Sequence, residues 1–214
     1  MALALVLSGT AASNSPANQE TGSMEHFSGE IRLNYIFAST GIIVDAGSTL
    51  VVDGDVNAGE FFICRGGTIQ ITGKLTAEVI YFDSAEAALE VEIGEVYARY
   101  YTQCGGTAEI SGNIVARSDG EDDGLGIVNI CSEYSANGTT SLTVDGGIFA
   151  RGGDIRAGRR PDGDEASTAS FFAVRGITIA GYEHPASGGS YTYIYTAKGL
   201  NATDGGTVYR DFAW

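Results

Sequence analysis

Short stretches of alternating apolar and polar residues recur along the chain, and a glycine lies at or just after the end of each. These stretches cover residues 50–53, 69–72, 89–92, 108–111 and 142–145. Apolar residues at every second position predict a strand with one face buried and the other in water. No stretch shows a sustained helical period. The pattern therefore predicts a series of short, half-buried strands.

A five-residue motif, Gly-x-(Val/Leu/Ile)-x-Ala, follows these strands and occurs five times. Its glycines are Gly54, Gly73, Gly94, Gly112 and Gly146. Its alanines lie 19, 21, 18 and 34 residues apart, at Ala58, Ala77, Ala98, Ala116 and Ala150. A period near 20 residues is typical of a solenoid, and the longest step indicates an insertion. Glycine suits a corner because a positive φ or a close backbone approach leaves no room for a Cβ.

A third apolar run follows the alanine, at residues 61–63, 79–82, 100–101 and 127–130. Three strands and three corners per repeat predict an all-β fold, a single-stranded, three-sided parallel β-helix in which equivalent strands pair from turn to turn. We expect the helix over residues 24–190, with loop insertions near 117–130 and 151–170. Weaker copies at 29–33 and 177–181 extend it. Residues 1–23 are predicted to form a flexible or capping arm, and the tyrosine-rich residues 191–214 a C-terminal cap.

The third runs suggest an interaction surface because they are apolar without alternation. Both sides of such strands favour leaving water, and an exposed apolar area of this size is typical of an interface. We therefore predict an aromatic interaction face formed by Phe61, Phe62, Tyr81, Tyr100 and Tyr101. A second copy of the chain or another protein would bind there. Alternatively, another segment of the chain covers this face.

Net charge limits which partners are expected to bind, and cysteine content limits the cellular compartments in which the chain is expected. The formal net charge of −15 repels phosphate backbones, so no nucleic-acid partner is expected. The three cysteines, Cys64, Cys104 and Cys131, contain no CxxC pair. An odd count argues against a disulfide framework and favours a reducing, cytoplasmic location. Secretion is the alternative, since residues 1–7 are apolar but lack a basic start. No run reaches the length of a transmembrane segment.

Few residues suggest catalysis, and no enzyme is expected. The acidic stretches 119–124 and 162–165 fit solvated loops, with a loose calcium site as the alternative. Four arginines lie between residues 151 and 160, beside acids that would neutralise them or next to a small anion site. Three outward acids or arginines clustered on one face would instead favour a carbohydrate-active enzyme.

The repeated unit, as in residues 69–77 and 108–116, resembles the bactofilin-like, polymer-forming β-helix proteins of bacteria. The resemblance covers residues 29–155. It implies a right-handed β-helix without a cofactor, and polymerisation through the end coils. The first functional hypothesis is therefore a non-catalytic scaffold that self-associates. The second is a protein-binding module using the aromatic face, and the third is a carbohydrate-active enzyme.

Overall fold

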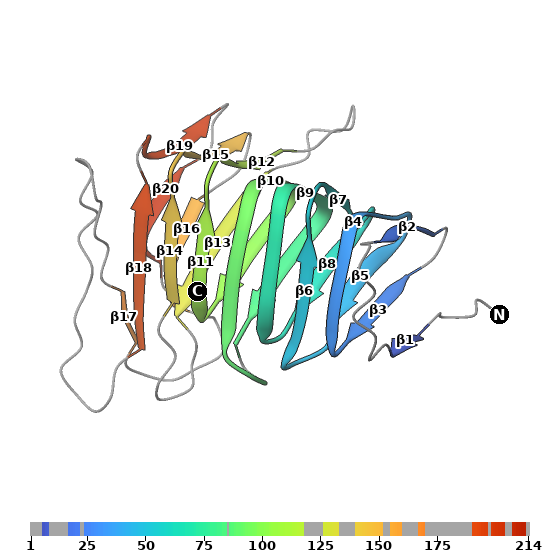
Figure 1. The fold of residues 1–214 in the computed structure, drawn as a ribbon. Coiled ribbons are helices and arrows are strands. Elements are labelled where there is room, and N and C mark those ends of the chain that lie inside the picture. Colours follow the sequence, from blue (N-terminus) through green and yellow to red (C-terminus); the bar gives the residue numbers. More distant parts are fainter. Residues whose placement is uncertain are drawn as a thin grey trace.

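The computed structural model describes residues 6–8, 17–21, 24–84, 86–117, 126–132, 140–151, 155–159, 167–169, 190–196, 198–203 and 207–212. Within these residues the regular structure is entirely β-strand. Strands stack along one axis, from the N-terminal turns (blue) to the C-terminal turns (red) (Figure 1). All the described pairings are parallel, so the chain forms a parallel β-solenoid.

The pairings sort the strands into three ladders, and β4, β9 and β10 turn corners and so belong to more than one. The first ladder contains β4 (Glu30–Ala38), β6 (Ser48–Val52), β9 (Gly67–Asp83), β10 (Leu89–Cys104), β11 (Gly106–Ile110), β14 (Thr140–Val144) and β18 (Ser190–Thr196), with β17 (Ser167–Ala169) beside β18. The second ladder contains β2 (Ala17–Thr21), β4, β7 (Val56–Asn57), β9, β10, β12 (Ile114–Ala116), β15 (Ile148–Arg151) and β19 (Leu200–Thr203). The third ladder contains β1 (Val6–Ser8), β3 (Glu25–Ser28), β5 (Gly41–Val44), β8 (Phe61–Cys64), β9, β10, β13 (Ile127–Ser132), β16 (Ile155–Arg159) and β20 (Val208–Phe212).

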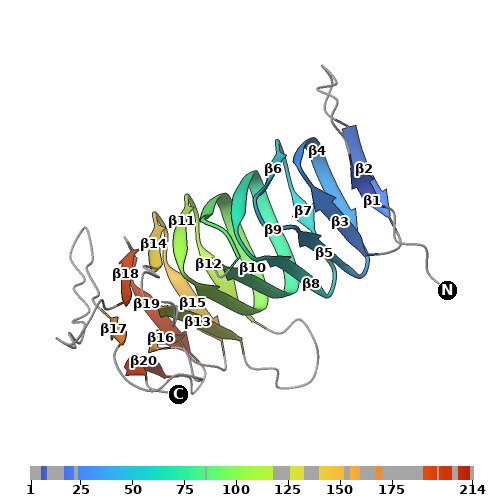
Figure 2. The same ribbon diagram turned by 90° about the horizontal axis from the view of Figure 1, so that it is seen from below.

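Strands of the third ladder lie side by side along the solenoid (Figure 2). Three paired strands per turn is the number that the sequence predicts. The cross-section of the coil and its hand stay predictions.

The repeat alanines form the column that the period predicts. Ala98 pairs with Ala77 on one side and with Ala116 on the other. The column continues from Ala116 through Ala150 to Ala202. Because each of these narrow corners lies directly on its neighbours, only a small side chain fits there.

The corner glycines are explained by close approach and not by backbone conformation. None of the five motif glycines has a positive φ. Instead, successive corners hydrogen-bond directly: the amide of Gly73 donates to the carbonyl of Gly54 at 3.1 Å. A Cβ added at Gly54 would lie 2.6 Å from the carbonyl oxygen of Asn34 in the preceding turn. The sequence allows two reasons for these glycines, a positive φ or a close backbone approach, and the structure supports the close approach.

The position of the corner in β4 differs from the sequence prediction. Residues 29–33 do not form a corner, because Glu30–Leu33 pairs with Thr49–Val52 in the first ladder. The corner of that turn follows them, since Ile36 and Phe37 pair with Val56 and Asn57. The buried Ala38 then precedes Ala58 in the column. Asn34 here occupies the glycine position, which hides this copy from a search for the motif.

The expected insertions and ends are partly strand. β13 contains the apolar run 127–130 that the sequence predicts as a third strand after the insertion, and it extends to Ser132. β16 lies inside the second range predicted as a loop insertion, 151–170, and pairs with β13 in the third ladder. The tyrosine-rich tail supplies β18, β19 and β20, which pair with β14, β15 and β16 as a further turn. At the other end, β1 and β2 of the predicted arm pair with β3 and β4. Residues 177–181 lie outside the described residues.

Candidate interaction surfaces

The third ladder alternates in and out, although its sequence does not show it. On β8, Phe62 and Cys64 are buried, whereas Phe61 and Ile63 are partly exposed. On the paired part of β10, Tyr101 is buried and Tyr100 is partly exposed. The prediction that both sides of these strands form a surface is therefore wrong for half of their residues.

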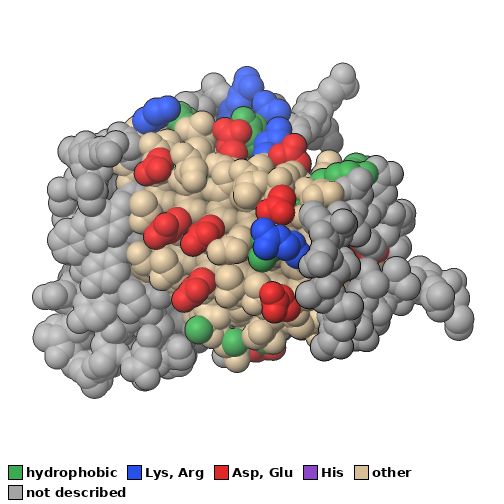
Figure 3. Space-filling model, in the orientation of Figure 1, with side chains coloured by type: hydrophobic (Ala, Val, Ile, Leu, Met, Phe, Trp, Pro, Cys, Tyr) green, Lys and Arg blue, Asp and Glu red, His purple; other side chains and the backbone are tan. Residues whose placement is uncertain are grey.

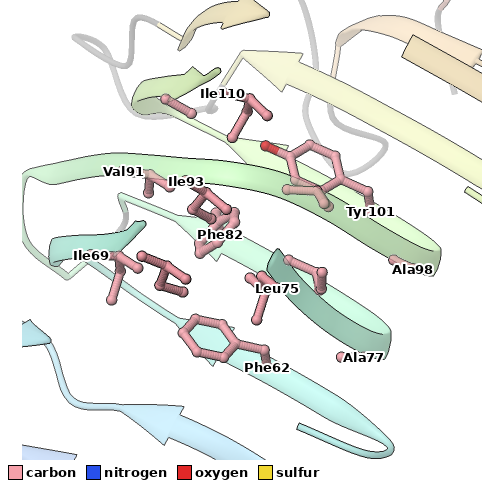
Figure 4. Close-up of a cluster of buried hydrophobic side chains, with 14 of the residues drawn as sticks. Phe62, Ile69, Leu75, Ala77, Phe82, Val91, Ile93, Ala98, Tyr101 and Ile110 are labelled. Carbon is pink, nitrogen blue, oxygen red and sulfur yellow. The ribbon is translucent and has the colours of Figure 1, made fainter. Parts of the chain in front are cut away.

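Phe62 and Tyr101 belong to the core and not to the predicted interaction face. Both side chains are 0% exposed. They pack edge-to-face on Phe82, with ring centroids 5.9 Å from Phe62 and 6.0 Å from Tyr101. Figure 4 shows the three rings inside the solenoid among the inward aliphatic side chains of neighbouring strands. This stack links three successive turns.

The outward residues of the same strands form an apolar surface, which we call the apolar face. Its members are Ile43, Phe61, Ile63, Val79, Tyr81, Tyr100 and Ile127. All are partly exposed. Phe61, Tyr81 and Tyr100 thus lie on the outside, as expected for an interaction face, while Ile43, Ile63, Val79 and Ile127 join them. Strand alternation applied from Phe62 as an inward residue would have identified these four.

Polar residues border the apolar face. At the edge where the third ladder begins, Arg99 donates to Glu78 at 3.1 Å and lies 5.1 Å from the ring centre of Tyr100. At the edge where it ends, the hydroxyl of Tyr81 donates to Asp83 at 2.7 Å. The arrangement is an apolar centre with a polar rim, which is the usual anatomy of a protein interface.

The first ladder presents a different surface. Its outward positions carry mostly threonine, serine, glutamine and acidic side chains, with Arg32 and Val51 among them, and acidic residues spread across this face in Figure 3. Glu90 and Glu92 point outward from β10, and Glu109 pairs with Glu92 from β11. These three acids meet the grouping that would favour an enzyme. All three are exposed.

The second ladder holds a column of arginines. Arg99, Arg117 and Arg151 each follow a column alanine in three successive turns, after the paired Ala98, Ala116 and Ala150. This grouping also meets the criterion for clustered arginines. Of the arginine-rich segment predicted at 151–160, only the side chain of Arg151 lies among those described.

The buried polar side chains of Tyr101 and Gln103 are hydrogen-bonded inside the solenoid. The Tyr101 hydroxyl donates to Gln103 Oε1 at 3.2 Å, and Gln103 Nε2 donates to the Ser141 carbonyl at 3.1 Å. Burial raises the pKa of Tyr101 well above its usual range. Burial also raises the pKa of Cys64 to about 11, against a weaker opposing effect from a backbone hydrogen bond of Gly66. Both groups are therefore unreactive at neutral pH.

The cysteines correct one prediction from the sequence. Cys104 is disulfide-bonded. Cys64 is free. In the backbone register, Cys104 and Cys131 are direct partners in neighbouring turns of the third ladder. Adjacent paired strands bring Cα atoms within the range that a disulfide requires. The odd cysteine count therefore reflects one bridge and one buried thiol.

The comparisons with protein-family models, curated proteins and solved structures found no match. Among the described residues no three histidine, cysteine, aspartate or glutamate side chains are grouped to hold a metal. No helix able to span a membrane occurs in the same residues. The acidic stretches 119–124 and 162–165 lie outside them.

Proposed function

We propose that this protein is a non-catalytic solenoid scaffold that self-associates, and that two copies meet through the apolar face. The observation that carries this proposal is the run of outward positions on the third ladder. From β5 through β13 the partly exposed strand positions of this ladder hold no charged residue; they are Ile43, Phe61, Ile63, Val79, Tyr81, Tyr100, Thr102, Ile127 and Asn129. A surface this uniform across paired turns is not needed to form the solenoid.

The charge of the chain favours a second copy as the occupant. With a formal net charge of −15, two copies repel each other wherever acidic surfaces approach. The apolar face is a surface where they could approach without opposing like charges, because its partly exposed strand positions carry no charge. A two-fold arrangement would place the same patch on both copies, as in most homodimers. Burial of the outward isoleucine, valine and aromatic side chains would supply the driving force, about 25 cal/mol per Å².

The disulfide supports a location for this scaffold. Disulfides form and persist in oxidising compartments and are rare in the cytosol. We therefore infer that the chain works outside the reducing cytosol, in the secreted or surface location that was the alternative from the sequence. The bond of Cys104 supports this inference.

A matched pair of valines tests the apolar face. Val79 points outward from the third ladder and Val51 from the first, and both are partly exposed. We expect the wild-type protein to sediment as a dimer or larger species. Val79→Asp should shift it to the monomer, because a carboxylate would be buried at the contact. Val51→Asp should leave assembly unchanged.

Sedimentation velocity over a range of concentrations measures the outcome, and far-UV circular dichroism checks that both variants fold. A strictly monomeric wild type overturns self-association. Equal dissociation by Val51→Asp would show that added charge alone disrupts assembly, and would remove the apolar face as its site.

A further inference from the structure

Gly41 on β5 is buried although it occupies an outward position of the third ladder. Ile42 and Val44 are the inward residues of this strand, so positions 41 and 43 face outward. Gly41 pairs directly with the outward Phe61 of β8, in strands that lie side by side (Figure 2). Gly41 has no positive φ. Its backbone conformation therefore does not explain why a glycine stands here.

The Phe61 ring takes the place of a side chain at Gly41. A Cβ added at Gly41 would lie 2.5 Å from Phe61 Cε2 and 2.6 Å from both Cδ2 and Cζ. Real Cβ atoms essentially never come so close to a neighbouring atom, and all three nearest atoms belong to this one ring. The ring of Phe61 therefore lies against β5 and covers Gly41, which accounts for the burial of this glycine.

Phe61 differs from the two tyrosines of the apolar face. The hydroxyl of Tyr81 donates to Asp83, and the guanidinium of Arg99 lies over the ring of Tyr100. Among the described residues, no cation and no second ring lies against the ring of Phe61. This side chain is partly exposed and has no polar atom. A partner can therefore cover the Phe61 ring without removing a polar group of that ring from water.

We propose that Phe61 is a main contact of self-association and that Gly41 is the residue that positions it. This inference rests on the proposed function, since it concerns the same apolar face. Two sheets that pack face to face lie about 10 Å apart, so their outward side chains must interdigitate. Glycine at position 41 lets the ring lie against β5. A methyl group there would push the ring away from β5 and change the shape of the surface that the second copy meets.

A pair of glycines tests the role of Gly41. Gly41→Ala should weaken self-association about tenfold, which corresponds to the loss of one substantial contact residue. The control Gly147→Ala adds the same methyl group on the second ladder, where a Cβ would lie 2.8 Å from Phe149 Cε2. It should leave the dissociation constant unchanged. Sedimentation velocity over a range of concentrations gives this constant, and thermal melting checks that both variants fold.

A double-variant cycle shows whether Gly41 acts through Phe61. Phe61→Val removes the ring and should itself weaken self-association. In the Phe61→Val background, Gly41→Ala should add nothing, because the methyl group no longer meets a ring. A ring over a glycine can also support the sheet within one chain. With that role alone, Gly41→Ala would lower the melting temperature and leave the dissociation constant unchanged, which would overturn the proposal.

Two further results would reject the positioning role of Gly41. One is an equal weakening of self-association by Gly147→Ala, and the other is full weakening by Gly41→Ala in the Phe61→Val background. If Val79→Asp dissociates the protein while Gly41→Ala does not, this inference fails and self-association through the apolar face stands. A strictly monomeric wild type would overturn both.

Discussion

The first and third ladders share one backbone arrangement and differ in what they present to water. Both bury every second residue, Leu50 and Val52 on β6 and Phe62 and Cys64 on β8. Outward, the first ladder carries acids and hydroxyl groups, whereas the third carries Phe61, Ile63 and their neighbours. Since the fold requires only the inward residues, the outward difference reports on what each surface meets. The first meets water, and the third is suited to a protein surface.

The largest effect should separate the inward from the outward side of a single strand. Phe62→Ala removes a fully buried ring that packs on Phe82 and should lower the free energy of unfolding by about 3–5 kcal/mol. Phe61→Ala, one residue earlier, should cost less than about 1 kcal/mol in the isolated chain, because its side chain is already partly in water. Urea unfolding measures both. Similar losses for the two variants would show that β8 does not alternate.

This comparison also explains how much of the inward and outward pattern can be predicted from the sequence. The alternation of the first ladder is visible because its outward residues are polar, and the alanine and glycine columns follow from spacing alone. On the third ladder the outward residues are themselves apolar, so the pattern loses its contrast. The sequence pattern therefore predicts Phe62 and Tyr101 on the surface, although the structure places them in the core.

The disulfide and the arginine column were missed for a different reason. Both features arise from strand pairing between two neighbouring turns. An insertion after Arg117 separates these turns in the sequence. Cys104 and Cys131 are direct neighbours only when β13 pairs with β10. Arg117 and Arg151 align only through the pairing of β12 with β15. A single copy of the repeat contains neither relation. Knowledge of the pairing across the insertion is what brings these residues together.

The second-largest expected effect comes from the disulfide bond within the third ladder. Cys104→Ser removes the bond between two turns and should lower the free energy of unfolding by about 2–4 kcal/mol, because the unfolded chain regains the entropy of an open loop. Alkylation followed by mass spectrometry gives an independent measurement. Under denaturing conditions without reductant one thiol should react, that of Cys64, and with reductant all three should. Three reactive thiols without reductant, in protein from its native compartment, would contradict both the bridge and the oxidising location.

The smallest expected effect is on how the free energy of unfolding depends on pH. It again contrasts the interior of the third ladder with its surface. The pKa of Cys64 rises from 9.0 to about 11 in the folded chain because the thiolate would be buried. The unfolded state therefore loses this proton first. The contribution of Cys64 is fully present below pH 9 and is lost as pH rises through about 11. Burial raises the pKa of Tyr101 in the same direction and extends the loss to higher pH.

Cys64→Val replaces this buried side chain by a slightly larger apolar one and removes its titration. It leaves no unpaired acceptor, because the Gly66 carbonyl that accepts from the thiol also accepts from the Gly47 amide at 3.2 Å. Between pH 8 and pH 10 the wild type should lose about 1 kcal/mol more stability than the variant. Ile63→Val, on the outward side of the same strand, should follow the wild-type profile. Parallel profiles for wild type and Cys64→Val would mean that water reaches the thiol, and that the interior of the third ladder is less closed than its outward face implies.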